Sequence, residues 1–425
     1  MQHKMAHVLI SIAIISAVGI SATPTWAGGQ PGHTPPSVAV TALRTVHVGA
    51  TAEAMAVDMR TNRVFVVNGG ALAYPDKPPV NSVVTLDARS GALLHTTLLP
   101  GQPFYLDVDA RLGRVFVTNP VRSAVDILDA TTGALIRATA VPSGPSVIAV
   151  DERTGRVFVL TDNTMTVLDA ASGRVLRGIP GFSGSSTSYN TLAIDAPAGR
   201  LFIRHSPPAA SCRATGGACI DVLDAATGAA LPPLPVAEPA DSVFVDAQAG
   251  RVMAMGEGGV VSVLDSSSGT RVADTTVATV PRAEVTSLPI HSAAVDSSDS
   301  RAVVLSAAVP DGAGLVAVLD TRDGRLVRRL VVDRPQPHAY LNIATGADDR
   351  GGYLYAATEQ TDPNHCCQPL GHTRLTVLDA TGGQVLGVVP VGHGAPTIAV
   401  DGQTGRAFVA TQEDGMVTVV SVTRR

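Results

Sequence analysis

The sequence predicts an all-β fold and, within that class, a β-propeller of eight four-stranded blades. Three observations support this prediction. A pattern of two Asp-containing turns recurs with a period of about 40–50 residues, which is typical of propellers. The segments between the turns are short and rich in β-branched residues. The two ends of the chain together supply the strands of one complete repeat.

The first turn of each repeat follows an apolar run that ends in Asp, and five residues later an Arg usually begins the next apolar run. These first-turn aspartates are Asp58, Asp109, Asp151, Asp195, Asp246, Asp296, Asp348 and Asp401. The later positions are Arg63, Arg114, Arg156, Arg200, Arg251, Arg301, Tyr353 and Arg406. An Asp at the start of a turn accepts backbone N–H bonds. We therefore predict that these carboxylates cap turns and do not form a catalytic array.

The second turn of each repeat is Leu-Asp followed four residues later by Gly. The second-turn aspartates are Asp87, Asp129, Asp169, Asp224, Asp265, Asp320 and Asp379. The Gly supplies the positive φ that such turns require. Within one repeat the two turns separate four predicted strands, at 147–150, 156–160, 165–168 and 174–177. Four antiparallel strands per repeat make a propeller blade.

The chain ends predict how the ring closes. The last repeat has strands at 396–400, 406–410 and 416–420, and the sequence then stops at Arg425 without a fourth strand. The segment Leu43–Gly49 resembles the fourth strand of the preceding repeat. We expect it to complete the last blade, because closure removes exposed sheet edges. The seventh repeat departs from the pattern at Tyr353, so a seven-bladed ring is the alternative.

Composition limits the classes of function. The chain has 425 residues, of which 45% are hydrophobic and only 4% aromatic, so the core must consist of Val, Ala, Leu and Ile. These residues suit strands more than long helices. The formal net charge of -5 argues against a strongly basic nucleic-acid surface.

The N-terminus has the pattern of a secretory signal peptide, predicted over residues 1–27. Lys4 precedes the apolar run Val8–Ala22, and small residues lead to a cleavage site after Ala27. The apolar run is short for a membrane span, although an uncleaved anchor is the alternative. Residues 28–37 are predicted to be a flexible leader and residues 38–425 a single propeller domain with no transmembrane span. We expect an exported protein, periplasmic or at the cell surface.

Four cysteines fit this exported setting. They are Cys212, Cys219, Cys366 and Cys367, and an even number in an exported chain favours disulfides. Proximity in the sequence suggests a Cys212–Cys219 bond and a bond between the adjacent Cys366 and Cys367. Cross-pairing of the four remains open.

The repeated motifs resemble a known family. Asp-Xaa-Xaa-Thr-Gly-Arg-Val-Phe-Val and Val-Thr-Val-Leu-Asp-Ala-Xaa-Thr-Gly are similar to the YVTN-family β-propeller repeats of exported and surface-layer proteins. The segment Arg114–Asn119 is nearest to the family core, and the resemblance extends from about Leu43 to the C-terminus. It implies a binding or structural protein, and it supplies no catalytic residue.

Loop lengths predict a binding face. In a four-stranded blade the two Asp turns lie at one end, here called the constant face, because their lengths hardly vary. The loops between strands two and three and between blades lie at the other end, the variable face. Its long loops are 69–82, 178–190, 205–219, 279–292 and 359–374. Length variation on one face of a repeat protein marks a binding face.

Candidate binding residues lie on or beside the variable loops. Tyr suits contacts with proteins, glycans or stacked bases, and His338 and His393 lie in blade-to-blade loops near the mouth of the central channel. The predicted binding residues are Tyr105, Tyr189, His291, His338, Tyr340 and His393.

A transition-metal site is a second hypothesis for this face. The predicted ligands are His338, His365, His372 and His393, which lie in or next to three loops around the seventh repeat. Imidazole and thiolate groups suit copper or zinc. The alternative is a disulfide-linked loop with unrelated surface histidines, since the spacing matches no standard metal motif.

The predicted function is noncatalytic binding of a protein or cell-envelope partner by a monomeric ring without a cofactor. No nucleophile elbow, phosphate loop or zinc-protease motif occurs. One alternative is an enzyme, of lyase, lactonase or metal-dependent type, that uses His338 and His393 near the central axis. Another is single-stranded nucleic-acid binding, which the acidic net charge disfavours.

Overall fold

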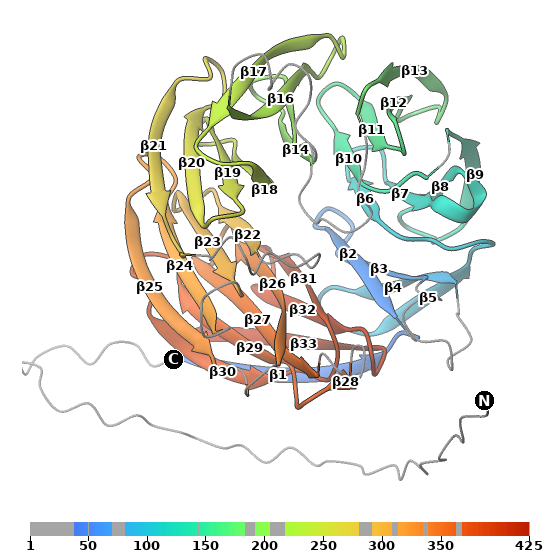
Figure 1. Cartoon of the computed structure of the whole chain (residues 1–425). Helices are drawn as coiled ribbons and strands as arrows, with labels where there is room; N and C mark the ends of the chain where they lie inside the picture. Colours follow the sequence, from blue (N-terminus) through green and yellow to red (C-terminus); the bar gives the residue numbers. More distant parts are fainter. Residues whose placement is uncertain are drawn as a thin grey trace, which may run out of the picture. The chain divides into compact units, whose positions relative to one another are not determined.

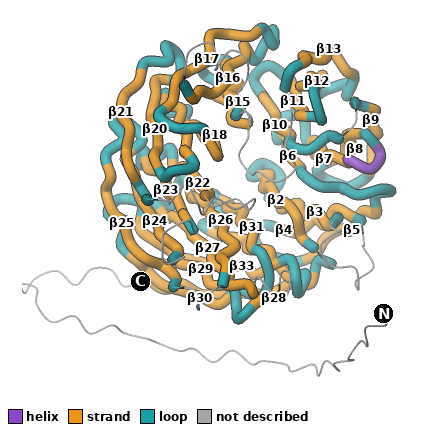
Figure 2. The backbone as a smooth tube through the Cα atoms, viewed as in Figure 1, coloured by secondary structure: helices purple, strands orange, loops and turns teal. Residues whose placement is uncertain are grey.

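The computed structural model describes residues 38–49, 51–69, 81–142, 144–182, 192–204, 217–279, 291–307, 313–334, 336, 339–362 and 368–424. The chain divides into two units, Met1–Ser37 and Val38–Arg425, and all described residues belong to the second. That unit is an all-β propeller of eight blades, each built from antiparallel strands (Figures 1 and 2). The prediction of eight blades is confirmed, and the seven-bladed alternative is wrong.

Each of the first four blades contains four consecutive strands, in the order of the sequence. Blade 1 has β2 (Ala52–Asp58), β3 (Arg63–Asn68), β4 (Ser82–Asp87) and β5 (Leu93–Leu98). Blade 2 has β6 (Leu106–Asp109), β7 (Arg114–Asn119), β8 (Ala124–Asp129) and β9 (Leu135–Ala140), with a short 3-10 helix η1 (Pro120–Arg122) between β7 and β8. Blade 3 has β10 (Ile148–Asp151), β11 (Arg156–Leu160), β12 (Thr164–Asp169) and β13 (Val175–Pro180). Blade 4 has β14 (Leu192–Asp195), β15 (Arg200–Ile203), β16 (Ala218–Asp224) and β17 (Ala230–Val236).

The next three blades follow the same order. Blade 5 has β18 (Ala240–Asp246), β19 (Arg251–Gly256), β20 (Val260–Asp265) and β21 (Arg271–Thr276). Blade 6 has β22 (His291–Asp296), β23 (Arg301–Ser306), β24 (Gly314–Asp320) and β25 (Leu326–Asp333). Blade 7 has β26 (Tyr340–Asp348), β27 (Tyr353–Asp362), β28 (Gln368–Pro369), β29 (Arg374–Asp379) and β30 (Val385–Pro390). Despite Tyr353, this blade has the longest first and second strands, and β28 adds a short pairing to β27. β27 therefore continues four residues into the loop predicted to begin at Glu359.

Blade 8 joins both ends of the propeller, as the sequence predicts. It contains β31 (Pro396–Asp401), β32 (Arg406–Thr411), β33 (Met416–Arg424) and, as the outer strand, β1 (Val38–His47). β1 pairs antiparallel with β33, from Val38 opposite Arg424 to His47 opposite Met416. β1 begins five residues before the predicted Leu43 because β33 also extends beyond its predicted end at Val420.

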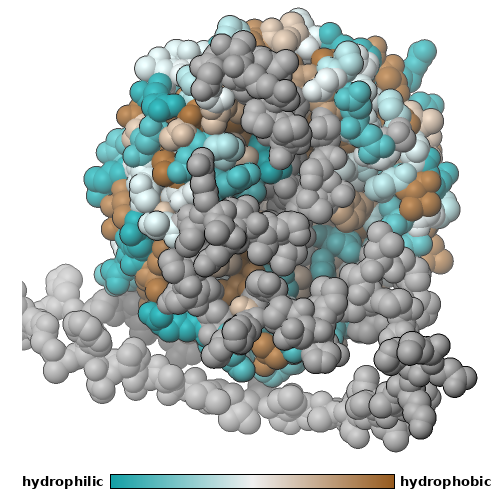
Figure 3. All heavy atoms as spheres, viewed as in Figure 1, coloured by the Kyte–Doolittle hydropathy of each residue, from teal (hydrophilic) through white to brown (hydrophobic). Residues whose placement is uncertain are grey.

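The first strands of the blades form the inner ring. β2, β6, β10, β14, β18, β22, β26 and β31 each contact the first strand of both neighbouring blades, and β31 contacts β2 to close the circle. The outermost strands instead carry most of the exposed large hydrophobic side chains, including Leu98 on β5 and Val388 on β30. In the space-filling view, brown hydrophobic residues are interspersed with teal hydrophilic ones over the visible described surface (Figure 3).

The core consists of apolar layers between adjacent blades. Eight buried clusters are found among the described residues, and each combines side chains from two neighbouring blades. The layers form because successive side chains of a strand point to opposite sides, so both faces of every blade are apolar. A large side chain near the middle of the second strand reaches the next blade in most layers. These residues are Phe65, Phe116, Phe158, Phe202, Met253, Val303, Tyr355 and Phe408.

Candidate functional site

The repeated first-turn aspartates cap the turns of the constant face. In blade 3, Asp151 Oδ1 accepts the backbone N–H groups of Arg153 and Thr154 at 3.0 and 3.3 Å. The Thr154 hydroxyl donates to Asp151 Oδ2 at 2.7 Å. Every first-turn aspartate is at most 1% exposed and accepts at least one backbone N–H of its own turn. These carboxylates cap turns, and they are not placed to meet a substrate.

The second-turn aspartates have the same task at the outer side of each blade. Asp169 Oδ1 accepts both the hydroxyl and the backbone N–H of Ser172, at 2.7 and 2.8 Å. These two bonds hold the pKa of the Asp169 carboxyl below its usual value. The corresponding bonds from Thr227 lower the pKa of Asp224 in the same way. A lowered pKa means that these carboxyls stay ionised, as an acceptor of N–H bonds requires.

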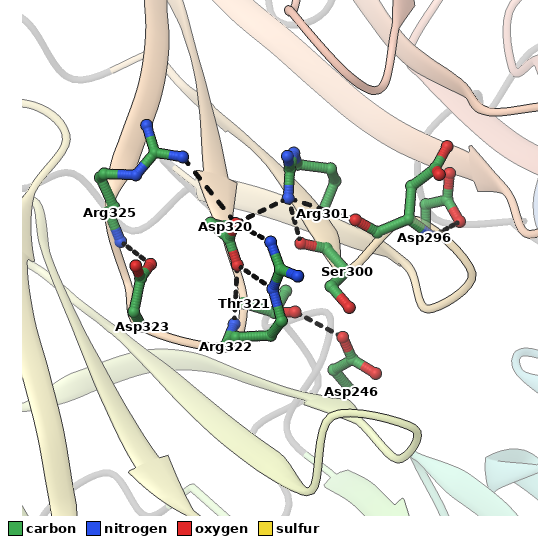
Figure 4. A network of polar contacts seen from close by, with 10 residues as sticks. Asp246, Asp296, Ser300, Arg301, Asp320, Thr321, Arg322, Asp323 and Arg325 are labelled. Atoms are coloured by element: carbon green, nitrogen blue, oxygen red, sulfur yellow. Dashed lines mark hydrogen bonds and ion pairs between the residues drawn. The ribbon is translucent and has the colours of Figure 1, made fainter.

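Polar side chains add links within and between blades on the constant face (Figure 4). Asp320 accepts hydrogen bonds from Arg322, at 2.6 and 2.9 Å, and from Arg301 at 2.9 Å. The bond from the Arg322 side chain makes the largest contribution to the pKa of Asp320, which is lowered to about 2. The Thr321 hydroxyl of blade 6 donates to Asp246 of blade 5 at 2.5 Å. The constant face is therefore a fixed scaffold.

The variable face differs from blade to blade at one inner position. The residue five places before each first-turn aspartate lies at the variable end of the first strand or just before it, and its identity changes around the ring. We call this residue the junction residue. In the described blades the junction residues are Glu53, Phe104, Ser146, Asp241, His291, Ile343 and Pro396. Three of them are ionisable. The variable end of the inner ring therefore carries polar groups that are not part of the repeated pattern.

Two acidic junction residues have partners on the preceding blade. Glu53 on β2 accepts a hydrogen bond from Gln412 of blade 8 at 3.2 Å. Burial raises the pKa of the Glu53 carboxyl to about 7. Asp241 on β18 lies 3.8 Å from Arg204 of blade 4, and burial raises its pKa to about 6 despite that cation. These carboxyls can exchange protons near neutral pH.

Blade 7 supplies a further buried carboxyl. Glu359 is 1% exposed, and it accepts the Gly394 N–H at 2.6 Å and the Asn342 side-chain amide at 3.0 Å. Burial, together with the nearby Glu413 and Asp414 carboxylates, raises the pKa of Glu359 to about 7 despite the two hydrogen bonds. Glu359 thus links blade 7 to the connection that enters blade 8.

His372 and His393, both predicted metal ligands, lie side by side next to this carboxyl. Their ring centres are 4.1 Å apart with an angle of 39° between the planes. His393 Nδ1 lies 3.0 Å from the Gly371 carbonyl, and the His393 backbone N–H donates to Asp414 at 2.9 Å. Among the described residues, no group of three or more His, Cys, Asp or Glu side chains is arranged to hold a metal ion. His338 and His365 lie outside those residues, so the four-histidine site stays a prediction.

The remaining predicted binding residues have different surroundings. His291 is in strand β22 rather than in the predicted loop 279–292, and it is 2% exposed. Tyr105 is partly buried and packs against the layers on both sides of blade 3, with its ring against Phe104. Tyr340 begins β26, and Tyr189 lies outside the described residues. The sequence missed Glu53, Asp241 and Glu359; their departure from the repeat was the available signal.

The cysteines are only partly within the described structure. Cys219, in β16, is disulfide-bonded. Cys212, Cys366 and Cys367 lie outside the described residues. The Cys212–Cys219 and Cys366–Cys367 pairings remain predictions.

The buried carboxyls lead to a prediction on pH and stability. A raised folded-state pKa makes an acid contribute stability below its unfolded pKa, near 4.5 for Glu, and lose it as pH rises through the folded value. Glu53→Gln removes this loss, because the amide is neutral at every pH. We expect the variant to gain stability over the natural protein between about pH 5 and pH 8, by on the order of 1 kcal/mol. Chemical unfolding at a series of pH values measures the difference.

An exposed carboxyl provides the control for this prediction. Asp323 is exposed on the constant face, where it caps Arg325. Asp323→Asn is expected to leave the pH dependence of stability between pH 5 and 8 unchanged. A Glu53→Gln variant whose stability difference from the natural protein does not change with pH would contradict the raised pKa of Glu53.

Comparison with known proteins supports the fold and leaves the family open. No protein-family model matches the chain, and no curated protein matches it. The chain is similar to the crystal structure of BamB from Moraxella catarrhalis, with a TM-score of 0.59 and 16% identity over 90% of this chain and 100% of that chain. It is also similar to the crystal structure of Saccharomyces cerevisiae Sqt1, with a TM-score of 0.63 and 15% identity over 90% of this chain and 99% of that one.

These likenesses show the propeller fold alone, because the identities are low. The resemblance to YVTN repeats stays a prediction, since no family model matches. Within the described part of the chain, no helix is long and apolar enough to span a membrane.

Proposed function

We propose that this chain is an exported, noncatalytic propeller that binds a protein or cell-envelope partner through its variable face. One observation carries the proposal. The repeated carboxylates are all engaged in turns on the constant face, whereas the polar residues that break the repeat gather at the variable ends of the inner strands. A rigid ring with one differentiated face is the arrangement that repeat proteins use for binding.

The charge of the variable face favours a protein partner over nucleic acid. Acidic side chains outnumber basic ones among the described residues at this end of the blades. The acidic residues are Glu53, Asp162, Glu238, Asp241, Glu257, Asp333, Glu359, Asp362, Glu413 and Asp414, and the basic ones are Arg122, Arg204, Arg334 and Arg374. Phosphate backbones require the opposite balance. We therefore favour a protein partner over single-stranded nucleic acid.

The enzymatic alternative rests on His338 and His393. His338 lies outside the described residues, and the His393 ring contacts His372 and the Gly371 carbonyl. Export is proposed from the signal-like residues 1–27, and a monomeric ring is proposed because blade 8 closes without a second chain.

Site-specific photocrosslinking tests the proposed face. Val121 in η1 and Leu370 are exposed on the variable face, and Met59 is exposed on the constant face. A photoreactive amino acid at each position, in protein produced in its native cells, is expected to capture the same partner from Val121 and Leu370 and none from Met59. Equal capture from Met59, or capture from Met59 alone, would reject the variable face as the binding surface.

A further inference from the structure

In several blades a polar residue five places after the start of the second strand holds the connection that enters that blade. Asn68 donates to the Val48 carbonyl at 2.7 Å in blade 1, and Asn119 donates to the Pro100 carbonyl at 2.7 Å in blade 2. In blade 7 the Thr358 hydroxyl donates to Asp333 at 2.8 Å. At this position groups of the protein itself thus accept the hydrogen of the buried polar side chain, although Asn68 Oδ1 has no donor.

Blade 6 departs from this rule. Ser306 occupies the same position at the end of β23, is 1% exposed, and its hydroxyl has no hydrogen-bond partner. His291, which pairs with Ser306 in the sheet, is 2% exposed. Its ring lies near enough to the Glu257 backbone to feel a hydrogen bond from it, but neither ring nitrogen makes a hydrogen bond of normal geometry. Ser242 of blade 5 is 1% exposed and its hydroxyl also has none. An unsatisfied buried polar group destabilises the folded protein, so a group of them requires an explanation.

These three side chains belong to the same layer between blades 5 and 6. Ala293 and Val295 of β22 pack into the layer formed with Met253 and Met255. His291 points to the same side because it lies two residues before Ala293 on the strand. Ser306 follows Ala302 and Val304 by the same alternation, and Ser242 precedes Phe244, which is in that layer. The polar groups therefore continue one apolar layer toward the variable face.

The charges beside this layer are unbalanced. Asp241 adjoins Ser242, and Glu257 lies close enough to oppose its ionisation. Among the ion pairs of the described residues, the one cation paired with either of these carboxylates is Arg204, which lies 3.8 Å from Asp241. Burial lowers the pKa of His291 to about 4, although a hydrogen bond to the Glu257 backbone opposes the shift, so the imidazole is neutral at physiological pH. A neutral imidazole offers one acceptor nitrogen.

We propose that the variable end of the blade 5–6 junction binds a primary ammonium group, such as the side chain of a lysine on the partner. The three N–H donors of an ammonium match three acceptors here, the His291 ring nitrogen and the hydroxyl oxygens of Ser242 and Ser306. The excess negative charge of Asp241 and Glu257 attracts the cation. This inference rests on the proposed function, because it names the chemistry that the variable face recognises.

Fluorescence anisotropy with a labelled peptide of alternating lysine and glycine tests this site. The natural protein is expected to bind the peptide, and a peptide with acetylated lysines is expected not to bind, because acetylation removes the charge and two of the three donors. Ser306→Ala and His291→Leu keep the net charge of the surface and are expected to weaken binding at least about tenfold. Ser267→Ala, an exposed constant-face serine of blade 5, is the matched control and is expected to bind normally.

Thermal unfolding separates recognition from misfolding. If the Ser306 hydroxyl is unsatisfied in the free protein, Ser306→Ala should unfold at the same or a higher temperature while its peptide binding falls. Unchanged peptide affinity in Ser306→Ala and His291→Leu, or equal binding of the acetylated peptide, overturns the inference. A lower unfolding temperature of Ser306→Ala also overturns it, because the hydroxyl would then have a partner within the protein.

Competition with methylammonium chloride identifies the source of the ammonium group. Displacement of the peptide indicates a site for any primary ammonium, whereas undisturbed peptide binding indicates a site that requires lysine within a chain. The photocrosslinks from Val121 and Leu370 do not depend on the junction. Loss of lysine binding with intact crosslinks would reject this inference and leave the proposed function in place.

Discussion

Val46→Asp is expected to lower the free energy of unfolding by about 3–5 kcal/mol, which is the cost of an uncompensated charge in a buried layer. Val46 lies on β1, is 8% exposed, and packs against Val417, Val419 and Phe408 in the layer between blades 8 and 1. This layer joins the two ends of the propeller, so a charge in it weakens the closure of the ring. Urea unfolding followed by circular dichroism measures the change.

The neighbouring residue provides a matched control. His47 is exposed on the opposite side of the same strand and pairs with Met416 in the sheet. His47→Asp introduces the same side chain one residue away, and we expect it to change the free energy of unfolding by less than about 1 kcal/mol. A similar decrease in the free energy of unfolding for both variants would contradict the assignment of Val46 to the core and His47 to the surface.

Asp151→Ala is expected to lower the free energy of unfolding by about 2–4 kcal/mol. The substitution leaves two backbone N–H groups and the Thr154 hydroxyl without their acceptor in a turn whose carboxylate is 1% exposed. Because this turn is on the constant face, photocrosslinking from Val121 should persist in the folded variant. Chemical unfolding measures the first effect, and the yield of the crosslinked adduct measures the second.

Blade 4 allows the reverse experiment on the same turn. Asp195 Oδ2 is buried without a partner, because Ala198 occupies the position that Thr154 occupies in blade 3. Ala198→Thr is expected to raise the free energy of unfolding by about 1 kcal/mol by supplying the missing hydroxyl. A stabilising Asp151→Ala, or a destabilising Ala198→Thr, would contradict the assignment of these carboxylates to turn capping.

The sequence located the face that carries the candidate site, but it did not predict which side chains on that face are buried. The alternation of constant turns and variable loops was sufficient to separate the two faces, because the ends at which loops lie follow from antiparallel connectivity alone. The sequence placed His291 in a loop, where it would be exposed. In the structure it begins β22 and is buried against blade 5, and no local pattern shows which neighbour covers a strand end.

The sequence by itself determined the eight blades, the turns that the aspartates cap and the strand that closes the ring. The turns depend on hydrogen bonds between residues near one another in the chain. The blades and the closing strand could be recognised because the same strand pattern recurs along the sequence, although β1 and β33 come from opposite ends of the domain. The tertiary structure alone decided how readily Glu53, Asp241 and Glu359 are protonated, because burial between blades raises their pKa values. It also decided that His291, Ser242 and Ser306 share one layer, because contact between blades joins residues far apart in the sequence.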